Sequence, residues 1–249
     1  MIAHTTAPQR AFTLNRDISV AKAAKAYART GVAVIDNVLD FECAATLASA
    51  MIAAPGFNLV TRIEHQHRDF DAGAMAGLAP GPRNKFNRLV DEEARTGFQY
   101  LYETYPLFDA ARQNLPLPGT FSGILGLVQS GEFLALARKV CWNEQIAFAD
   151  AQLTRFQPGH FLSRHDDDAP GKQRVAAYVL QLCSDWRADF GGVLNFFTPD
   201  DEIRRSLTPG FNRLVLFSVP RPHAVSAVTA FAPGPRLAMT GWLRKGAPD

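Results

Sequence analysis

The chain has 249 residues, 47% of them hydrophobic and 20% charged, which suffices for one large domain or two small ones with a substantial core. The formal net charge of +2 gives no electrostatic case for a nucleic-acid partner. No apolar run approaches the roughly 18 residues that span a bilayer, and no apolar run flanked by basic residues marks a secretory signal, so we expect a soluble, cytoplasmic protein without a membrane partner.

The N-terminal half is predicted to be mainly helical. After a loose start over residues 1–16, apolar spacing, caps and helix breakers define the next elements. We expect helices over 17–29, over 41–53 with Asp40 as the cap, over 121–129 and over 131–140, strands over 32–35 and 57–63, and a mainly helical segment over 86–105. The glycine- and proline-rich stretch 66–87 is predicted to be a long loop over a functional site.

After about residue 147, short apolar or alternating runs are separated by glycine and proline turns. Eight strands at this spacing are typical of a sandwich or a jelly roll. They are predicted over 148–156, 160–164, 174–182, 193–197, 203–207, 213–218, 223–228 and 236–243. We therefore predict an α+β fold in a single domain, 1–249. Its double-stranded β-helix (jelly-roll) core covers 147–245, and residues 1–146 form a supporting helical half with flanking strands.

Three residues of the predicted core have the pattern of a metal site. His165 and Asp167 follow a predicted strand two residues apart, so their side chains point to the same side of an extended segment, whereas Asp166 points away. His223 begins a later strand, and distant strands of a jelly roll face each other across the barrel mouth. Two histidines and one carboxylate on adjacent vertices suit non-haem Fe(II), because three coordination positions stay open.

Arg236 opens the last predicted strand among apolar neighbours. An arginine that points inward from such a strand needs an anion, and its planar guanidinium matches a carboxylate in two parallel hydrogen bonds. The far carboxylate of 2-oxoglutarate would supply that partner. The alternative is a salt bridge to one of the chain's own acids.

Together these features resemble the 2-oxoglutarate/Fe(II) oxygenase superfamily, and within it the prolyl 4-hydroxylase-like branch that includes ribosomal-protein prolyl hydroxylases. The resemblance runs from about Ala151 to Arg244. It is carried by residues 161–168 (FLSRHDDD), 174–180 (RVAAYVL), 191–197 (GGVLNFF), 222–223 (PH) and 236–242 (RLAMTGW). An HxD pair alone is a weak signal, but its ordered combination with the double glycine, the distal histidine and the arginine is specific.

The resemblance implies a dioxygenase that uses Fe(II), 2-oxoglutarate and O2, with ascorbate as an optional addition, to hydroxylate a prolyl residue in a protein or peptide. The alternatives are hydroxylation of a free amino acid or another small metabolite, and a jelly-roll binding module without turnover. Relatives contact the co-substrate from the strand after the metal motif. There Tyr178 and Gln181 are the candidates, on opposite faces of the strand, and both stay open. Phe156 stands where relatives have a tyrosine.

Other residues of metal-binding types have simpler interpretations. His65 and His67 lie among charged residues with no third ligand in view, which favours a solvated loop, and His160 is expected to be structural. The three cysteines are widely spaced, which disfavours a disulfide framework or a structural zinc site. A zinc or manganese site of the cupin type is the main rival to iron, and Trp242 is expected in the core.

Overall fold

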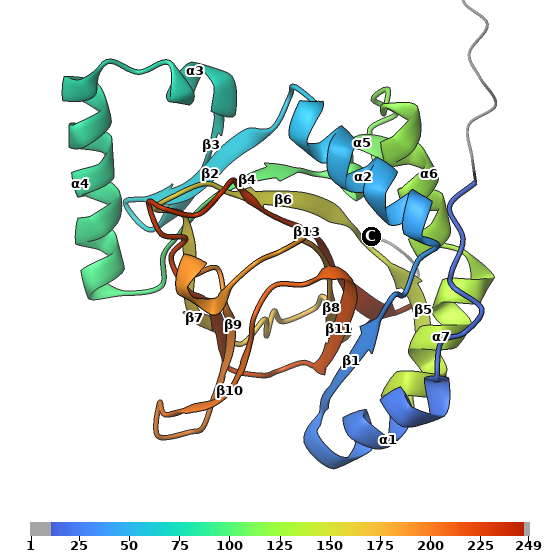
Figure 1. Ribbon diagram of the computed structural model, residues 1–249. Helices are drawn as coiled ribbons and strands as arrows, with labels where there is room; N and C mark the ends of the chain where they lie inside the picture. Colours follow the sequence, from blue (N-terminus) through green and yellow to red (C-terminus); the bar gives the residue numbers. More distant parts are fainter. Residues whose placement is uncertain (1–10, 247–249) are drawn as a thin grey trace, which may run out of the picture.

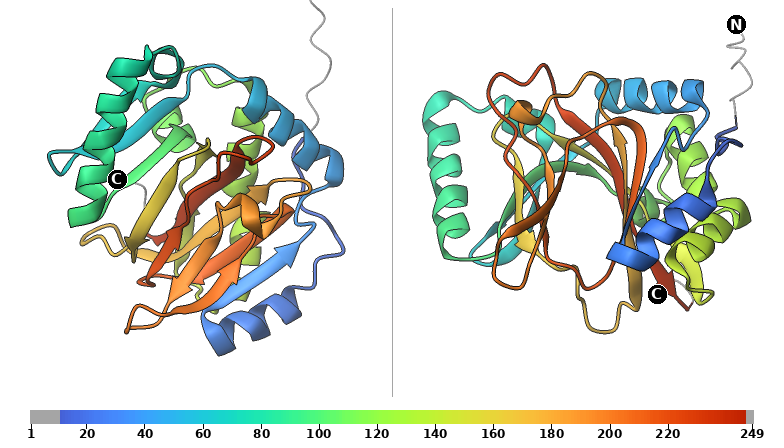
Figure 2. Two further views of the ribbon diagram at one scale, coloured as in Figure 1. Left: turned by 60° about the vertical axis from the view of Figure 1, so that its left-hand side comes forward. Right: turned by 60° about the horizontal axis from the view of Figure 1, so that its bottom comes forward.

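The computed structural model describes residues 11–246, so residues 1–10 of the predicted loose start lie outside the described part. A single, strongly curled antiparallel sheet forms a half-barrel at its centre (Figure 1). Helices α1, α2, α5, α6 and α7 gather on one side of the molecule, and α4 stands apart on the opposite side, against the outer face of the curled sheet (Figure 2). The predicted α+β jelly-roll class is confirmed.

Seven α-helices and one short 3-10 helix lie within residues 11–246. They are α1 (Val20–Thr30), α2 (Phe41–Ala53), α3 (Ala72–Ala76), α4 (Pro80–Thr96), α5 (Leu107–Arg112), α6 (Gly119–Val128), α7 (Gly131–Cys141) and η1 (Ala188–Phe190). The predicted cap Asp40 accepts hydrogen bonds from the first turn of α2, and Ser130 caps α7 in the same way. No single helix in this range could cross a membrane by length and apolar composition, although α6 and α7 pass that test as a pair bent by 46°.

Thirteen strands make up the sheet in the described part of the chain. They are β1 (Val32–Asp36), β2 (Asn58–Ile63), β3 (Gln66–Asp71), β4 (Tyr100–Tyr105), β5 (Ile146–Ala149), β6 (Gln152–Phe156), β7 (Phe161–His165), β8 (Arg174–Leu182), β9 (Leu194–Phe197), β10 (Ile203–Leu207), β11 (Phe211–Ser218), β12 (His223–Val225) and β13 (Arg236–Lys245). The order is β1-β11-β8-β13-β6-β4-β7-β12-β9-β10, with β2 attached to β4, β3 attached to β2, and β5 attached to β13. The N-terminal half therefore contributes strands to the sheet as well as helices.

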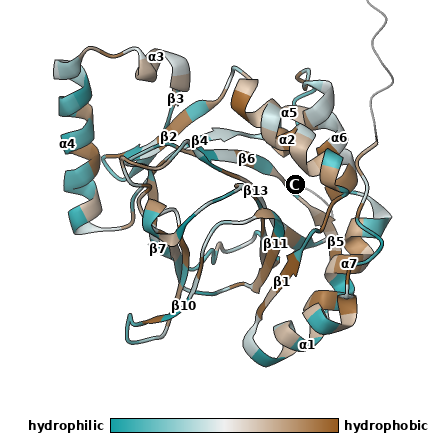
Figure 3. Cartoon of the chain, in the orientation of Figure 1, coloured by the Kyte–Doolittle hydropathy of each residue, from teal (hydrophilic) through white to brown (hydrophobic). Residues whose placement is uncertain are grey.

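The two faces of the sheet bury different sets of side chains. Along β8, Ala177 and Val179 belong to the cluster inside the half-barrel, and Tyr178 and Leu180 belong to the cluster under the helices. This alternation follows the two-residue period of a strand. The buried faces of α6 and α7 supply much of the helix-side cluster, and these helices are correspondingly apolar (Figure 3).

The predictions for the segment 66–105 are wrong where the structure has β3, where it has α3 and the first half of α4, and where it has β4. The predicted loop contains β3 and two helices, and the predicted helix over 86–105 ends at Thr96 and gives way to β4. Strand β3 has no apolar face, and α4 buries only Val90, so neither has a clear apolar period (Figure 3). The β4 sequence YLYETY follows the helix closely, and its place in the middle of the sheet, between β6 and β7, decides its conformation.

Two smaller differences concern flanking elements. The predicted strand over 148–156 is two strands, β5 and β6, separated at Asp150 and Ala151. Strand β5 pairs only with the end of β13, while β6 also pairs with β4, so the break lets the chain change partners. Helix α5 lies in a stretch for which no element was predicted.

Candidate metal centre

A cavity of about 210 Å³ opens inside the half-barrel. Its lining includes His165 at the end of β7, Asp167 just beyond it, His223 at the start of β12 and Arg236 at the start of β13. Strands β7 and β12 pair so that His165 lies opposite His223, and their ring centroids are 4.1 Å apart. The sheet thus brings together residues separated by more than fifty positions in the chain.

The three predicted ligands present their donor atoms to one point. The Nε2 atom of His165 lies 3.4 Å from one carboxylate oxygen of Asp167, and the Nε2 atom of His223 lies 3.5 Å from the other. One ligand atom from each residue falls within 4.8 Å of the others. Within residues 11–246 no other group of three potential ligands comes as close together. This arrangement can hold one metal ion.

Backbone contacts fix the orientation of both imidazoles. The Nδ1 atom of His165 lies 2.9 Å from the carbonyl oxygen of Ser163, and the Nδ1 atom of His223 lies 2.7 Å from that of Arg221. Each Nδ1 therefore carries the hydrogen and donates it, which leaves the Nε2 lone pair free for a metal. Burial, aided by the neighbouring His165, lowers the pKa of His223 to about 4 and keeps the ring neutral.

The acidic run 166–168 separates cleanly into one inward and two outward side chains. Asp166 and Asp168 are exposed, and the Asp166 carboxylate accepts a hydrogen bond from the backbone N–H of Asp168. Burial alone would raise the pKa of Asp167, but hydrogen bonding to His165 and the nearby His223 outweigh it and lower that pKa. Asp167 is thus held as a carboxylate that faces the two imidazoles.

Two residues that the sequence analysis did not assign to the site hold Asp167 in place. Asp167 has a left-handed backbone with φ +65°, which is uncommon for a residue other than glycine. Its carbonyl oxygen accepts a hydrogen bond of 2.9 Å from Arg174, whose guanidinium lies 3.6 Å from the ring centroid of Trp242. Trp242 borders the cavity. The sequence analysis selected Arg236 because it opens an apolar strand. Arg174 opens such a strand too, so the same pattern could have found it.

Arg236 lies in the wall of the same cavity as a buried cation. Its side chain is 1% exposed, and burial lowers its pKa. The Nε atom donates to the carbonyl oxygen of Gly192 at 2.8 Å, and no carboxylate of the described residues pairs with the guanidinium. Gly192 has φ +65°, and a Cβ atom there would lie 2.7 Å from the Arg236 Cδ, so this turn requires glycine. The alternative, a salt bridge from Arg236 to one of the chain's own acids, is absent from the described part.

The structure separates the two candidates for a further co-substrate contact. Tyr178 borders the cavity, but its hydroxyl donates to the carbonyl oxygen of Asp150 at 2.8 Å, and its ring packs on Phe133 of α7. Gln181 does not border the cavity, yet it lies on the barrel face opposite Ala238 in register, two residues from Arg236. Its Nε2 atom is buried without a hydrogen-bond partner.

The three other histidines of residues 11–246 lie outside the cluster. His65 sits in the turn between β2 and β3, and His67 on β3 contacts the Tyr100 hydroxyl at 2.6 Å and Asp69 at 2.9 Å. Both are exposed, as predicted, although His67 belongs to a strand and not to a loop. His160 is buried beside a second cavity.

Residues 151–244 match the family model of the 2OG-Fe(II) oxygenase superfamily. A curated relative, the prolyl 3-hydroxylase OGFOD1 of Mus musculus, is 30% identical over 119 residues, which is 45% of this chain and 21% of the mouse protein. The chain therefore spans about a fifth of the length of that relative.

Two solved structures share the fold. A prolyl-4-hydroxylase from Pseudomonas putida aligns with a TM-score of 0.58 at 17% identity, over 92% of this chain and 100% of that chain. A prolyl hydroxylase from Trichoplax adhaerens, in complex with a hypoxia inducible factor peptide fragment, gives 0.58 at 17%, over 91% and 89%. The matched segment 151–244 contains His165, Asp167, His223 and Arg236, so all four predicted site residues lie in the part of the chain that is similar to the 2OG-Fe(II) oxygenase superfamily.

Proposed function

We propose that this protein is an Fe(II)- and 2-oxoglutarate-dependent dioxygenase that hydroxylates a prolyl residue of a protein or peptide. One observation carries the proposal: the cavity that gathers two imidazoles and a carboxylate also contains a buried arginine without an acidic partner. A buried cation costs free energy unless an anion reaches it. A co-substrate that chelates a metal at one end and carries a carboxylate at the other satisfies both features.

The donor set fits Fe(II). His165 and His223 would bind the ion through Nε2 and Asp167 through its carboxylate, on one face of the coordination sphere, which leaves positions for 2-oxoglutarate and O2. Bound iron would supply the oxidation of an unactivated C–H bond, with 2-oxoglutarate converted to succinate and carbon dioxide. This ligand set, with a partnerless arginine in the same wall, favours iron over the zinc or manganese rival.

The chain's own residues would bind and orient 2-oxoglutarate and would exclude water from the cavity. Arg236 would take the far carboxylate of 2-oxoglutarate in a charge-assisted pair. Gln181 is the better second donor, because its amide NH2 group has no hydrogen-bond partner, whereas the Tyr178 hydroxyl is already engaged. The other walls are largely apolar side chains, which exclude water and strengthen both contacts. They include Phe156, Leu162, Val179, Leu194, Phe217 and Val225.

The named activities of the mouse relative and of both structural neighbours support a prolyl residue as the substrate. The Trichoplax neighbour is solved with a peptide fragment, which supports a polypeptide. At the mouth of the cavity, Phe98 is 37% exposed and its ring lies 5.3 Å from that of His165, so an apolar substrate group has a surface beside the metal ligands. The cytoplasmic location, the use of ascorbate and the absence of nucleic-acid and membrane partners stay predictions.

A matched pair of peptide libraries tests the proposal. Each member of the first library contains one proline, and the second library has alanine in its place. Protein supplied with Fe(II), 2-oxoglutarate, ascorbate and air should form succinate faster with the proline library, and some of those peptides should gain one oxygen atom by mass spectrometry. Stimulation by a free amino acid and by neither library would support the metabolite alternative. Tight 2-oxoglutarate binding without succinate would support the binding module.

A further inference from the structure

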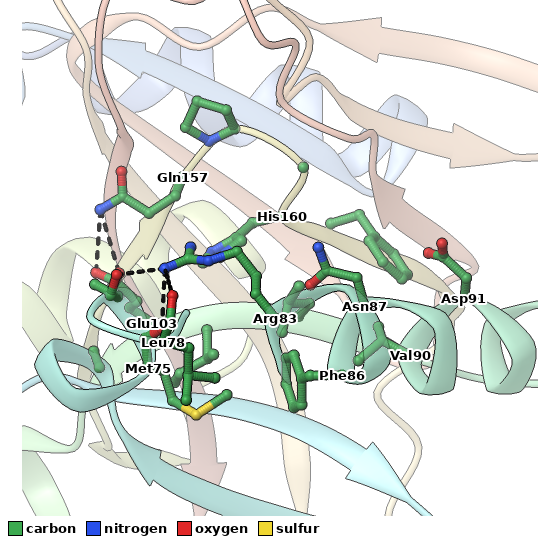
Figure 4. A pocket seen from close by; sticks show the side chains of 17 residues that line it. Met75, Leu78, Arg83, Phe86, Asn87, Val90, Asp91, Glu103, Gln157 and His160 are labelled. Atoms are coloured by element: carbon green, nitrogen blue, oxygen red, sulfur yellow. Dashed lines mark hydrogen bonds between the residues drawn. The ribbon is translucent and has the colours of Figure 1, made fainter. Parts of the chain in front are cut away.

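A second, larger cavity of about 390 Å³ lies on the other face of β4. Tyr100 and Tyr102 of this strand line the metal cavity, while Leu101 and Glu103, which alternate with them, line the second one. Helix α4 forms the opposite wall (Figure 4). The two cavities are therefore separated by the sheet, and the second one takes no part in the proposed reaction.

One stripe of α4 faces this cavity. Arg83, Asn87 and Asp91 are four residues apart and so lie on one side of the helix, with Phe86 and Val90 beside them. The cation and the acid at the two ends of the stripe are separated by about 12 Å at 1.5 Å per residue. The cavity thus has a positive end at Arg83 and an exposed acidic end at Asp91.

Arg83 has hydrogen-bond donors to spare. Its Nη2 atom contacts the carbonyl oxygens of Met75, Ala76 and Leu78 around the end of α3. Within the described residues it forms no ion pair, and its Nε and Nη1 atoms have no hydrogen-bond partner. A guanidinium has five N–H donors in a planar fork, so the unused edge can accept a carboxylate.

The other charged or titratable side chains leave the Arg83 charge uncompensated. The Glu103 carboxylate is bound by Arg155 at 2.7 Å and by the Gln157 amide at 3.3 Å. Burial lowers the pKa of His160 to about 4, so its ring is neutral near pH 7. Asp91 lies at the far, exposed end. An anion in this cavity therefore finds its electrostatic partner in Arg83.

Apolar side chains provide another part of the lining. The side chains that provide it are Leu59, Met75, Leu78, Phe86, Val90 and Leu101. The volume falls within the range of about 300–1,000 Å³ that small-molecule sites occupy. We propose that this cavity binds a small monocarboxylate with an apolar body, whose carboxylate pairs with Arg83 while the body packs on the β4 face. The proposal does not depend on the proposed reaction.

Isothermal titration calorimetry tests this site. The protein is first loaded anaerobically with Mn(II) and saturating 2-oxoglutarate, so that the carboxylate site of the metal cavity is filled. Phenylacetate, 3-phenylpropionate and hexanoate are the probes, and the corresponding uncharged amides are the controls. We expect at least one acid to bind and its amide to bind at least tenfold more weakly. Absence of binding by all three acids at millimolar concentration would overturn the proposal.

Variants locate the interaction. Arg83→Gln should weaken the acid at least tenfold, while Arg88→Gln, on the same helix but outside the cavity lining, should leave its affinity unchanged. Since Arg83 also contacts α3, Asn87→Phe serves as a second variant that narrows the cavity from its exposed rim and leaves Arg83 in place. It should also weaken binding. Equal affinity in wild type and both cavity variants, or equal affinity for acid and amide, would contradict the assignment.

Discussion

The two cavities on either face of β4 are built in different ways. The metal cavity is lined by strands of one sheet, and its imidazoles are fixed by backbone carbonyls two residues away in each case. The second cavity, which lies outside the half-barrel and is called the outer cavity below, has one wall formed by α3 and α4. Helix α4 buries only Val90, and most of its surface is hydrophilic (Figure 3). Chemistry that needs fixed geometry therefore sits inside the sheet, where backbone contacts hold the two imidazoles.

The largest expected effect separates Asp167 from its neighbour. Asp167→Ala should lower turnover by more than about 100-fold, because the loss of a metal ligand should exceed the 10- to 100-fold cost of removing its supporting contacts. Asp166→Ala is the matched control and should stay within about twofold, since its side chain is exposed. Succinate formation measures both. The reverse result would place the carboxylate ligand one residue earlier.

The next effect concerns the buried cation. Arg236→Met should weaken 2-oxoglutarate by about 30-fold or more, as expected for truncating one partner of a buried charge pair, and leave metal affinity unchanged. Without 2-oxoglutarate, the variant should be at least as stable as the wild type, because it loses a buried charge that lacks a counter-ion. Thermal unfolding with and without 2-oxoglutarate measures both quantities. A ligand-induced rise in Tm as large as in the wild type would contradict the role of Arg236.

His160, which lines the outer cavity, makes the stability of the fold depend on pH. Burial lowers the pKa of His160 to about 4 from the ordinary 6.5, so the unfolded chain takes up a proton below pH 6.5 that the folded chain excludes until about pH 4. Stability from this residue is complete above pH 6.5 and falls by up to about 3 kcal/mol as the pH drops to 4. In His160→Gln, urea unfolding of the metal-free protein should show a shallower loss over this window. Parallel profiles for wild type and variant would contradict the assignment.

The smallest expected effect distinguishes the two faces of β8. Gln181→Met should weaken 2-oxoglutarate binding about fivefold. This corresponds to roughly 1 kcal/mol, the net free energy of one hydrogen bond. Tyr178→Phe should leave that affinity unchanged and cost about 1 kcal/mol of stability, because the hydroxyl loses its bond to Asp150. Calorimetric titration and urea unfolding measure the two quantities. If Tyr178→Phe alone weakened the co-substrate, the assignment of the two faces would be wrong.

The same contrast explains which parts of the molecule could be predicted from the sequence. Strands β8 and β13 are long apolar runs between turn residues, and their predicted ranges match closely. The pattern of His165, Asp167, His223 and Arg236 also pointed to one site, because ligand types and spacing limit the chemistry.

Other features depend on contacts that no local pattern records. Strand β4 lies between β6 and β7 and was missed, and α4 has almost no apolar stripe, so only its second half, from residue 86, was predicted as a helix. The choice between Tyr178 and Gln181 required the hydrogen-bond partners of the Tyr178 hydroxyl and of the Gln181 amide, which only the structure gives. The support of Asp167 by Arg174 depends on a left-handed turn that the sequence does not reveal.

The most direct test of the central claim is an anaerobic titration of the protein with Fe(II) and 2-oxoglutarate, followed by visible absorption. Chelation of the iron by the co-substrate should give a weak metal-to-ligand charge-transfer band, followed by succinate when air is admitted. His223→Ala should abolish both signals, and Arg236→Met should require a higher 2-oxoglutarate concentration for the same band. Bound metal without the band in the wild-type protein would contradict the account, because the cavity would then not hold the co-substrate against iron.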